Sequence, residues 1–166
     1  MIILSIDCGT KHFSWCAITD DHQIIGWEVC HLYSNNARTF LQSIAACDDF
    51  FEKVQLADQI IIEQQPPRNY GMLRQMFYLE LFCAQHAPTC LVHAQTKNAV
   101  WKRHLPSFVH PRTYSARKKC SIETVTTLLD TGIVSVCMDH NPFEDAKKKD
   151  DLSDCLCQAL GYSRLS

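Results

Sequence analysis

The chain has 166 residues, of which 46% are hydrophobic and 20% charged, and its formal net charge is −2. These values are ordinary for a folded globular protein, so they argue against disorder and predict a single domain over residues 1–166. No apolar run approaches the roughly 20 residues that a membrane-spanning helix needs, which argues against a membrane protein.

The first part of the chain has the pattern of three short strands. An apolar run covers Ile2–Asp7, and Phe13–Thr19 and Ile24–Leu32 follow it, the last two separated by the turn-forming residues 20–23. These short connections predict a three-stranded antiparallel meander. Because the first residues already have a strand pattern, we expect no secretory signal peptide.

Beyond the meander, helices alternate with strands. Helical periodicity covers Asn35–Val54 and Met72–Gln85. Between them, the isoleucine run Asp58–Glu63 predicts a strand that is buried on both faces. A fifth strand is predicted in the stretch CLVHA, and Gln95–Pro111 is interpreted as a short helix and a long loop.

Two further helices complete the prediction. The first covers Ser121–Leu129 and starts nearer Ser115, and the second covers roughly Asp150–Gly161 after a loop that contains Pro142. Three antiparallel strands followed by alternating helices and strands predict an α/β fold, with a five-stranded mixed sheet flanked by helices.

The ten cysteines lie mostly within apolar stretches, as Cys83 does in YLELFCAQ. This placement favours free thiols in an intracellular, reducing compartment over a disulfide framework. Four residues have a spacing that zinc could use: Cys83, His86, Cys90 and His93. However, Cys90 and His93 fall in a predicted strand, where an odd separation points them to opposite faces, so core thiols and ordinary histidines are expected.

Charge is distributed unevenly along the chain. No acidic residue lies between Glu80 and Glu123, whereas this stretch carries seven of the sixteen lysines and arginines, with aromatic residues interleaved. The seven are Lys97, Lys102, Arg103, Arg112, Arg117, Lys118 and Lys119. A solvated basic face would be the simplest interpretation, but the absence of acids favours a groove for a polyanion such as nucleic acid.

Several carboxylates are placed so that they could converge. Asp7 and Glu63 each end a predicted strand, and if those strands are parallel neighbours, both side chains lie at the sheet edge where α/β folds usually bind ligands. In the last helix, Asp151 and Asp154 share a face, and so would Asp150 and Asp154.

Such a cluster needs positive charge nearby. Two unit charges about 4 Å apart repel by about 4 kcal/mol at an effective dielectric constant near 20. Either protons are retained or divalent cations bind, and oxygen ligands suit Mg²⁺ or Mn²⁺. Two such ions about 3.5–4 Å apart could activate water and stabilise the leaving oxygen in phosphodiester hydrolysis.

Each acid also has a simpler interpretation. Asp7 could be a turn residue, and Asp150 or Asp151 could cap the last helix. Glu63 is harder to explain in this way, because an acid that ends a strand of isoleucines is unfavourably placed without a partner. Taken as a set beside the basic stretch, the acids favour a metal site.

Four stretches of the chain resemble the RuvC-type Holliday junction resolvases, and most closely the poxvirus-like and other viral members of that group. In chain order they are SIDCGTKHFSW, IIIEQQPPRN, YSARKKCSIETV and KKDDLSDCLCQAL. The start of the first stretch also resembles actin-like kinases, but 166 residues contain no second phosphate loop. The combination with the final D-D-x-x-D is what makes the resemblance specific.

The resemblance implies an RNase H-like fold and a homodimer that cuts four-way (Holliday) and related branched DNA symmetrically. It implies Mg²⁺ as the cofactor, with Mn²⁺ as a substitute and two ions per site, and no nucleotide cofactor or membrane partner. A viral member would act in the host cytoplasm. Two alternatives stay open: another RNase H-like nuclease, acting for example on RNA–DNA hybrids, and a catalytically inactive junction-binding module.

Carried over by position, the resemblance implies that four acids bind the metal and take part in catalysis: Asp7, Glu63, Asp151 and Asp154. It also implies a catalytic lysine, for which Lys119 matches best by its distance to Ile122 and Lys118 next. The choice between Asp150 and Asp151 stays open, with Asp150 assigned to the helix cap or to a place outside the metal ligands. Candidate DNA contacts are Arg68, Arg74, Lys102, Arg103, Arg117 and Lys118.

Overall fold

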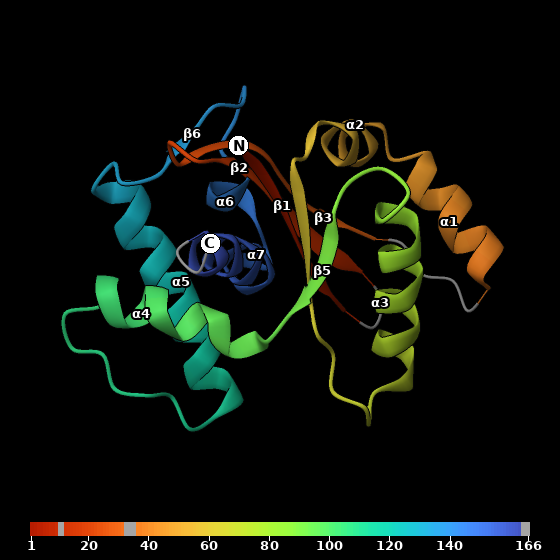
Figure 1. The fold of residues 1–166 in the computed structure, drawn as a ribbon. Helices are drawn as coiled ribbons and strands as arrows, with labels where there is room; N and C mark the ends of the chain where they lie inside the picture. The colour runs from red at the N-terminus through yellow and green to blue at the C-terminus, as the bar shows by residue number, and fades with distance from the viewer. Residues whose placement is uncertain (10–11, 32–35, 164–166) are drawn as a thin grey trace.

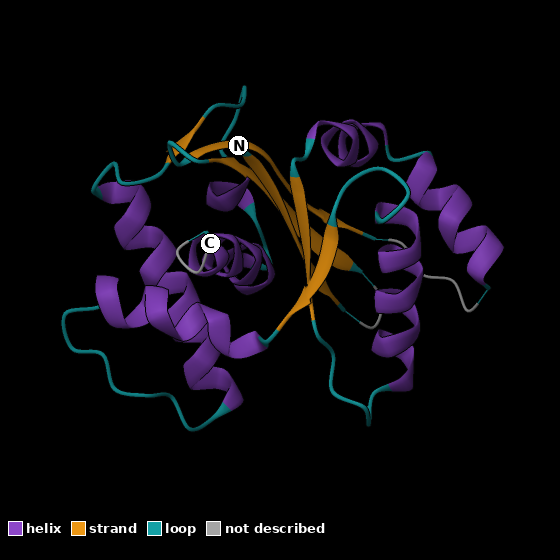
Figure 2. Ribbon diagram, viewed as in Figure 1, coloured by secondary structure: helices purple, strands orange, loops and turns teal. Residues whose placement is uncertain are grey.

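The computed structural model describes residues 1–9, 12–31 and 36–163, and within them a mixed sheet lies between two layers of helices (Figure 1, Figure 2). The strands follow the order β5-β4-β1-β2-β3-β6 across the sheet. Their bounds are β1 Ile2–Cys8, β2 Phe13–Thr19, β3 Gln23–Cys30, β4 Gln59–Glu63, β5 Thr89–Val92 and β6 Ser135–Val136. The predicted antiparallel meander is confirmed, because β2 pairs antiparallel with both β1 and β3.

The register of β1 and β4 brings two strand ends together. These strands are parallel neighbours, and Ile6 is level with Ile62. Asp7 and Glu63, the next residues of the two strands, therefore lie at the same edge of the sheet. The isoleucines of β4 are fully buried, as expected for a strand that has helices on both of its faces.

One face of the sheet is covered by three helices, α1 Ala37–Ala45, α2 Asp48–Leu56 and α3 Tyr70–Cys83 (Figure 1). The single helix predicted over Asn35–Val54 is in fact two helices, and Asn35 itself lies outside the described residues. Cys47 leaves helical geometry with φ −90° and ψ 85°. The apolar periodicity continues across this break because α1 and α2 pack into the same core cluster.

The opposite face is covered by a second group of helices (Figure 1). They are η1 Ala94–Thr96, α4 Lys97–His104, α5 Tyr114–Asp130, α6 Pro142–Asp145 and α7 Lys149–Tyr162. Helix α7 is fixed to the sheet by polar contacts as well as by its apolar side chains. The indole Nε1 of Trp27 donates to the carbonyl of Leu152 (3.0 Å), and Nε2 of Gln158 donates to the carbonyl of Ile6 (3.3 Å).

The sheet has six strands instead of the five predicted. The additional strand, β6, pairs parallel with the start of β3 at the outer edge. Two residues are too few to show an alternating pattern, so this strand could not be recognised in the sequence. At the other end of β3, the predicted strand extends to Leu32, which lies outside the described residues.

Among the described residues, no helix is both long enough and apolar enough to span a bilayer.

All ten cysteines are free thiols, and six of them are buried: Cys8, Cys16, Cys30, Cys83, Cys155 and Cys157.

Candidate active site

The structure brings the four predicted acids into one cleft at the carboxyl ends of β1 and β4. This cleft has a volume of about 300 Å³, and its lining includes Asp7, Glu63, Asp151 and Asp154. Asp7 and Glu63 come from the sheet, whereas Asp151 and Asp154 come from the first half of α7. In this arrangement three separate segments of the chain contribute carboxylates to a single site.

Asp7 is the acid with the most unfavourable surroundings. Its side chain is partly accessible from the cleft, but it is enclosed enough that burial is the largest cause raising its pKa well above the ordinary value of 3.8. The negative charge of Glu63 raises the pKa further, and the ammonium of Lys97 offsets part of the effect. None of the ion pairs formed by the described residues of this cluster engages Asp7.

Lys97, at the start of α4, lies between two of the acids. Its Nζ is 2.7 Å from Oε2 of Glu63 and 3.2 Å from Oδ2 of Asp154, and its side chain is only 7% exposed. Burial lowers the pKa of Lys97, but the charges of Glu63 and Asp154 more than compensate, so the net shift is upward. Lys97 therefore remains a cation, and its ammonium group lies between these two carboxylates.

The sequence includes Lys97 in the basic stretch but does not single it out as a site residue. The available signal is topological: β5 pairs parallel with β4, so the segment after β5 arrives at the same edge as Glu63. Only close packing then sets the position of this segment. A Cβ atom added to Gly161 of α7 would lie 2.4 Å from the carbonyl oxygen of Thr96, so the glycine permits η1 to approach the helix.

The lysine that α5 contributes to the cleft is Lys118 and not Lys119. Lys118 forms an ion pair with Asp150, and its Nζ lies 3.8 Å from Oδ1 of Asp151. Lys119 has a 76% exposed side chain and pairs with Glu123 one helical turn along α5. Lys118 and Lys119 are separated by a rotation of about 100° about the helix axis, so they point in different directions. Their spacing to Ile122 does not show which of the two faces the cleft.

The sequence analysis assigned Asp150 either to the cap of α7 or to a place outside the metal ligands, and the structure does not place it at the cap. The N-cap position is Lys148, and Asp150 lies in the first turn of the helix. Its carboxylate is paired with Lys118, whereas the cleft that contains Asp7 is lined by Asp151 and not by Asp150. The geometry thus favours Asp151 and Asp154 as the pair that faces Asp7 and Glu63.

Two side chains that the sequence analysis did not indicate also contact Asp151. The Nε2 atom of His12 lies 2.8 Å from Oδ2 of Asp151, and Nζ of Lys148 lies 3.4 Å from the same oxygen. In addition, the hydroxyl of Ser14 donates to the main-chain carbonyl of Asp151 (3.0 Å). The contacts of His12 and Ser14 hold the start of α7 against the beginning of β2.

A second pocket, of about 360 Å³, adjoins the acid cleft and is rich in basic and aromatic residues. The two pockets share Glu63, Tyr114, Lys118 and Asp154. Of the six predicted DNA contacts, Arg117 and Lys118 line this second pocket, together with Arg112. The other four lie on exposed surface outside both pockets: Arg68, Arg74, Lys102 and Arg103.

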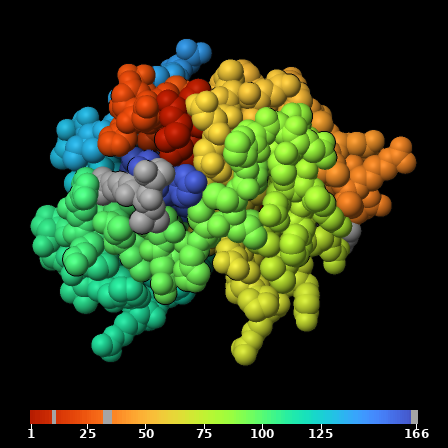
Figure 3. All heavy atoms as spheres, in the orientation of Figure 1, coloured from red at the N-terminus to blue at the C-terminus, as the bar shows by residue number. Residues whose placement is uncertain are grey.

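The space-filling view shows the surroundings of this site (Figure 3). The segment after β4 and the segment before α5 both project from the lower margin of the molecule, and a notch separates them.

The zinc spacing in the sequence does not correspond to a site. Among the described residues, no three of Cys83, His86, Cys90 and His93 bring their ligand atoms within 4.8 Å of one another. Cys83, the last residue of α3, is buried in the core, and Sγ of Cys90 lies 3.8 Å from the hydroxyl of Tyr162. The prediction that Cys83 is a thiol of the hydrophobic core is therefore confirmed.

Several solved structures that share this fold are resolvases. The fowlpox virus Holliday junction resolvase matches with a TM-score of 0.71 and 16% identity, covering 100% of each chain. The yeast mitochondrial Holliday junction resolvase matches with a TM-score of 0.68 and 18% identity, over 98% of this chain and 78% of that one. RuvC of Thermus thermophilus, solved with a Holliday junction substrate, matches with a TM-score of 0.64 and 15% identity, over 100% and 97% of the chains.

At these identities the structural matches establish the RNase H-like fold, and sequence comparison decides the family. No curated protein sequence matches the chain significantly. The family model described as "Poxvirus A22 protein" matches residues 1–165, which is nearly the whole sequence. A match of this extent, on the fold of the fowlpox enzyme and with the acids gathered in one cleft, shows that the chain belongs to the Poxvirus A22 protein family.

Proposed function

We propose that this chain is a Holliday junction-resolving nuclease, which hydrolyses phosphodiester bonds in four-way and related branched DNA with the help of divalent metal ions. The observation that carries the proposal is the cleft in which Asp7, Glu63, Asp151 and Asp154 meet. A basic pocket adjoins this cleft and shares part of its lining. Its family and the fold that it shares with junction resolvases support the same activity.

The residues of the cleft fit a hard divalent cation. All four acids offer oxygen, which Mg²⁺ and Mn²⁺ prefer over nitrogen or sulfur. Burial and, to a smaller extent, the charge of Glu63 raise the pKa of Asp7, and a cation would offset the repulsion between the carboxylates. When bound, Mg²⁺ would lower the pKa of a water molecule and stabilise charge on the phosphate oxygens. Two ions per site remain our proposal.

The lysines of the site would act on the charge of the phosphate. In the structure, Lys97 neutralises Glu63 and Asp154, and these acids are not gathered into a compact set of three ligands. Lys97 would therefore hold the two carboxylates in place before the metal binds. Lys118, which reaches the cleft from α5, is the better candidate for a positioned cation at the scissile phosphate.

DNA would reach the acids along the basic pocket. Arg112 and Arg117 are exposed at its rim and can contact phosphates, which contribute most of the affinity that does not depend on sequence. Cutting two strands of a junction symmetrically requires two sites, so we propose that the active form is a homodimer. We also propose the host cytoplasm as the place of action, consistent with ten free thiols.

The decisive experiment compares cleavage of four labelled substrates: a four-way junction, a flap, a duplex and an RNA–DNA hybrid. With Mg²⁺ or Mn²⁺, we expect paired symmetric cuts in the junction and little cleavage of the duplex. The Asp7→Asn and Glu63→Gln variants should lose cleavage while still shifting the junction in a gel. Preferred cleavage of the hybrid would indicate a different RNase H-like nuclease, and binding without any metal-supported cleavage would indicate an inactive junction-binding module.

A further inference from the structure

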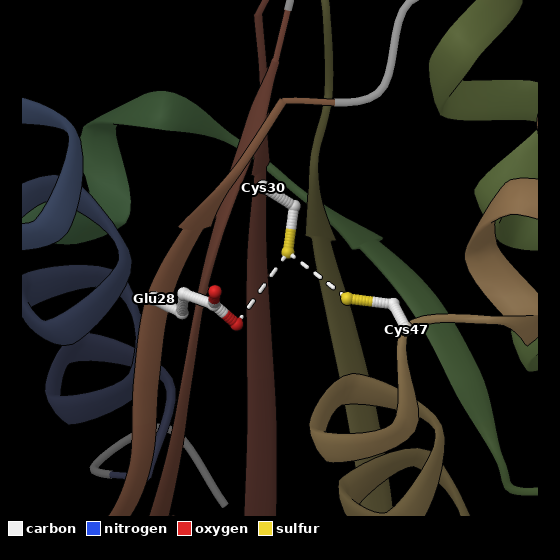
Figure 4. A group of neighbouring side chains, drawn as sticks. All are labelled: Glu28, Cys30 and Cys47. Atoms are coloured by element: carbon white, nitrogen blue, oxygen red, sulfur yellow. Dashed lines mark hydrogen bonds between the residues drawn. The ribbon is translucent and has the colours of Figure 1, made fainter.

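A second group of metal-binding side chains lies outside the active site, at the end of β3. Glu28 and Cys30 are two residues apart on this strand, so their side chains lie on the same face of the sheet. Cys47 approaches them from the segment between α1 and α2. Figure 4 shows the Cys30 sulfur between the Glu28 carboxylate and the Cys47 sulfur. Among the described residues, this is the one group of three whose ligand atoms lie within 4.8 Å of one another.

The distances match those of a zinc site. Sγ of Cys30 is 3.6 Å from Sγ of Cys47 and 3.8 Å from Oε2 of Glu28. Two sulfurs bound to one tetrahedral Zn²⁺ at about 2.3 Å lie about 3.8 Å apart, and a sulfur and a carboxylate oxygen lie about 3.5–3.7 Å apart. Small side-chain rotations would therefore place one ion in contact with all three atoms. A disulfide would need the two sulfurs at about 2.05 Å.

The sulfurs of Cys30 and Cys47 are held in place by their surroundings. The indole Nε1 of Trp15 donates a hydrogen bond to Sγ of Cys30 (3.3 Å), which is the kind of contact that orients a metal ligand. Cys47 is the N-cap residue of α2, and its side chain forms no hydrogen bond that caps the helix. In the metal-free protein, burial and the charge of Glu28 raise the pKa of the Cys30 thiol, so a cation would have to displace a proton.

The chemistry of the ligands distinguishes this site from the acid cleft. Two sulfurs select a soft or borderline metal, whereas Mg²⁺ prefers oxygen alone. Glu28 is exposed, and it leaves one side of the group open to solvent.

We propose that Cys30, Cys47 and Glu28 bind one Zn²⁺ ion, with water as the fourth ligand. The ion would be structural, joining the α1–α2 connection to the end of β3. That end belongs to the same sheet edge as the active site: Cys30 pairs with Phe13, and the preceding residue, His12, contacts Asp151. This inference does not depend on the nuclease activity.

The first test measures zinc bound to the full chain. Protein purified without chelator or exposed to Zn²⁺ alone is passed through a desalting column, and its zinc content is determined by elemental analysis. We expect one zinc ion per chain in the wild type, and a loss of at least about tenfold in Cys30→Ser and Cys47→Ser. Two variants should keep the ion: Cys137→Ser, which alters an exposed thiol, and Asp7→Asn, which alters the acid cleft.

A second measurement uses the wild type only, so that it stands even if a cysteine variant fails to fold. Co²⁺ bound in place of zinc should give thiolate-to-metal charge-transfer absorption, and bound Zn²⁺ should protect Cys30 and Cys47 from alkylation in peptide mass analysis. Zinc content that is unaffected by both cysteine substitutions would overturn the proposal. A Cys30–Cys47 disulfide that persists in the presence of excess Zn²⁺ would also overturn it, because the same sulfurs cannot do both.

Discussion

The ammonium of Lys97 lies 2.7 Å from the carboxylate of Glu63, and both groups are largely buried at the edge of the sheet. The same ammonium is 3.2 Å from Asp154, so one lysine connects the end of β4 to α7. Its position is that of an internal counter-ion for acids that would otherwise repel one another. We therefore expect the proposed metal binding to depend on this ion pair.

Replacing Lys97 by Met should destabilise the metal-free protein. The substitution leaves Glu63 and Asp154 without their counter-ion, and breaking a buried ion pair in this way costs about 3 kcal/mol. Thermal unfolding measured with and without Mg²⁺ would show the loss, which added Mg²⁺ should partly restore. Lys102→Met, on the exposed part of the same helix, is the matched control and should change stability little. Equal unfolding temperatures for both variants would contradict the role assigned to Lys97.

Asp7→Asn should stabilise the metal-free protein while abolishing cleavage. In the folded state, the pKa of Asp7 is raised above its ordinary value of 3.8, so between the unfolded and folded pKa values the folded state binds more protons. Stability therefore falls as pH rises through this interval, and the amide removes that dependence. Each 1 kcal/mol relieved raises the unfolding temperature by about 2–4 °C.

The measurement for Asp7→Asn is a series of thermal unfolding curves between acid and neutral pH, with and without Mg²⁺. The wild type should gain stability when Mg²⁺ is added at neutral pH, and the variant should gain clearly less. Glu123→Gln, far from the cleft on the exposed face of α5, provides the control for loss of a carboxylate. If the variant were less stable than the wild type at neutral pH, the strain assigned to Asp7 would be absent.

Lys118→Ala should slow junction cleavage by about 100-fold, the effect expected from removing one positioned charge at the reacting phosphate. Lys119→Ala should stay within about twofold of the wild type, because its ion pair with Glu123 is exposed and contributes little. Single-turnover cleavage with saturating enzyme separates this effect on chemistry from an effect on binding. The opposite order of the two variants would return the catalytic role to Lys119.

Arg117→Ala should weaken junction binding without a large effect on the rate of cleavage of bound DNA. Arg117 lines the basic pocket, and each lost phosphate contact reduces the slope of log affinity against log salt by about 0.9. Gel-shift titrations of the catalytically inactive Asp7→Asn background at several salt concentrations would measure this slope. Lys102→Ala, which alters a residue outside both pockets, should change the slope less.

Much of the fold could be predicted from residue patterns because the information is local. The isoleucines of β4 need cover on both faces, and the acids of α7 are three residues apart on a helix. The parallel pairing of β1 with β4, which places Asp7 beside Glu63, was only a condition in the sequence analysis, and the structure supplied it. The break at Cys47 and the two-residue strand β6 escaped prediction, since neither interrupts the local pattern by more than a residue or two.

The sequence by itself determined which residue types are present for a metal site and on which elements they lie. Only the tertiary structure decided which cation meets which acid: Lys97 fills the space between Glu63 and Asp154, and Lys118 faces the cleft while Lys119 faces solvent. The reason is that ion pairs over distances of 30 residues or more depend on how helices pack, as Gly161 against Thr96 illustrates. Spacing along the chain fixes the face of a helix, but packing fixes what that face meets.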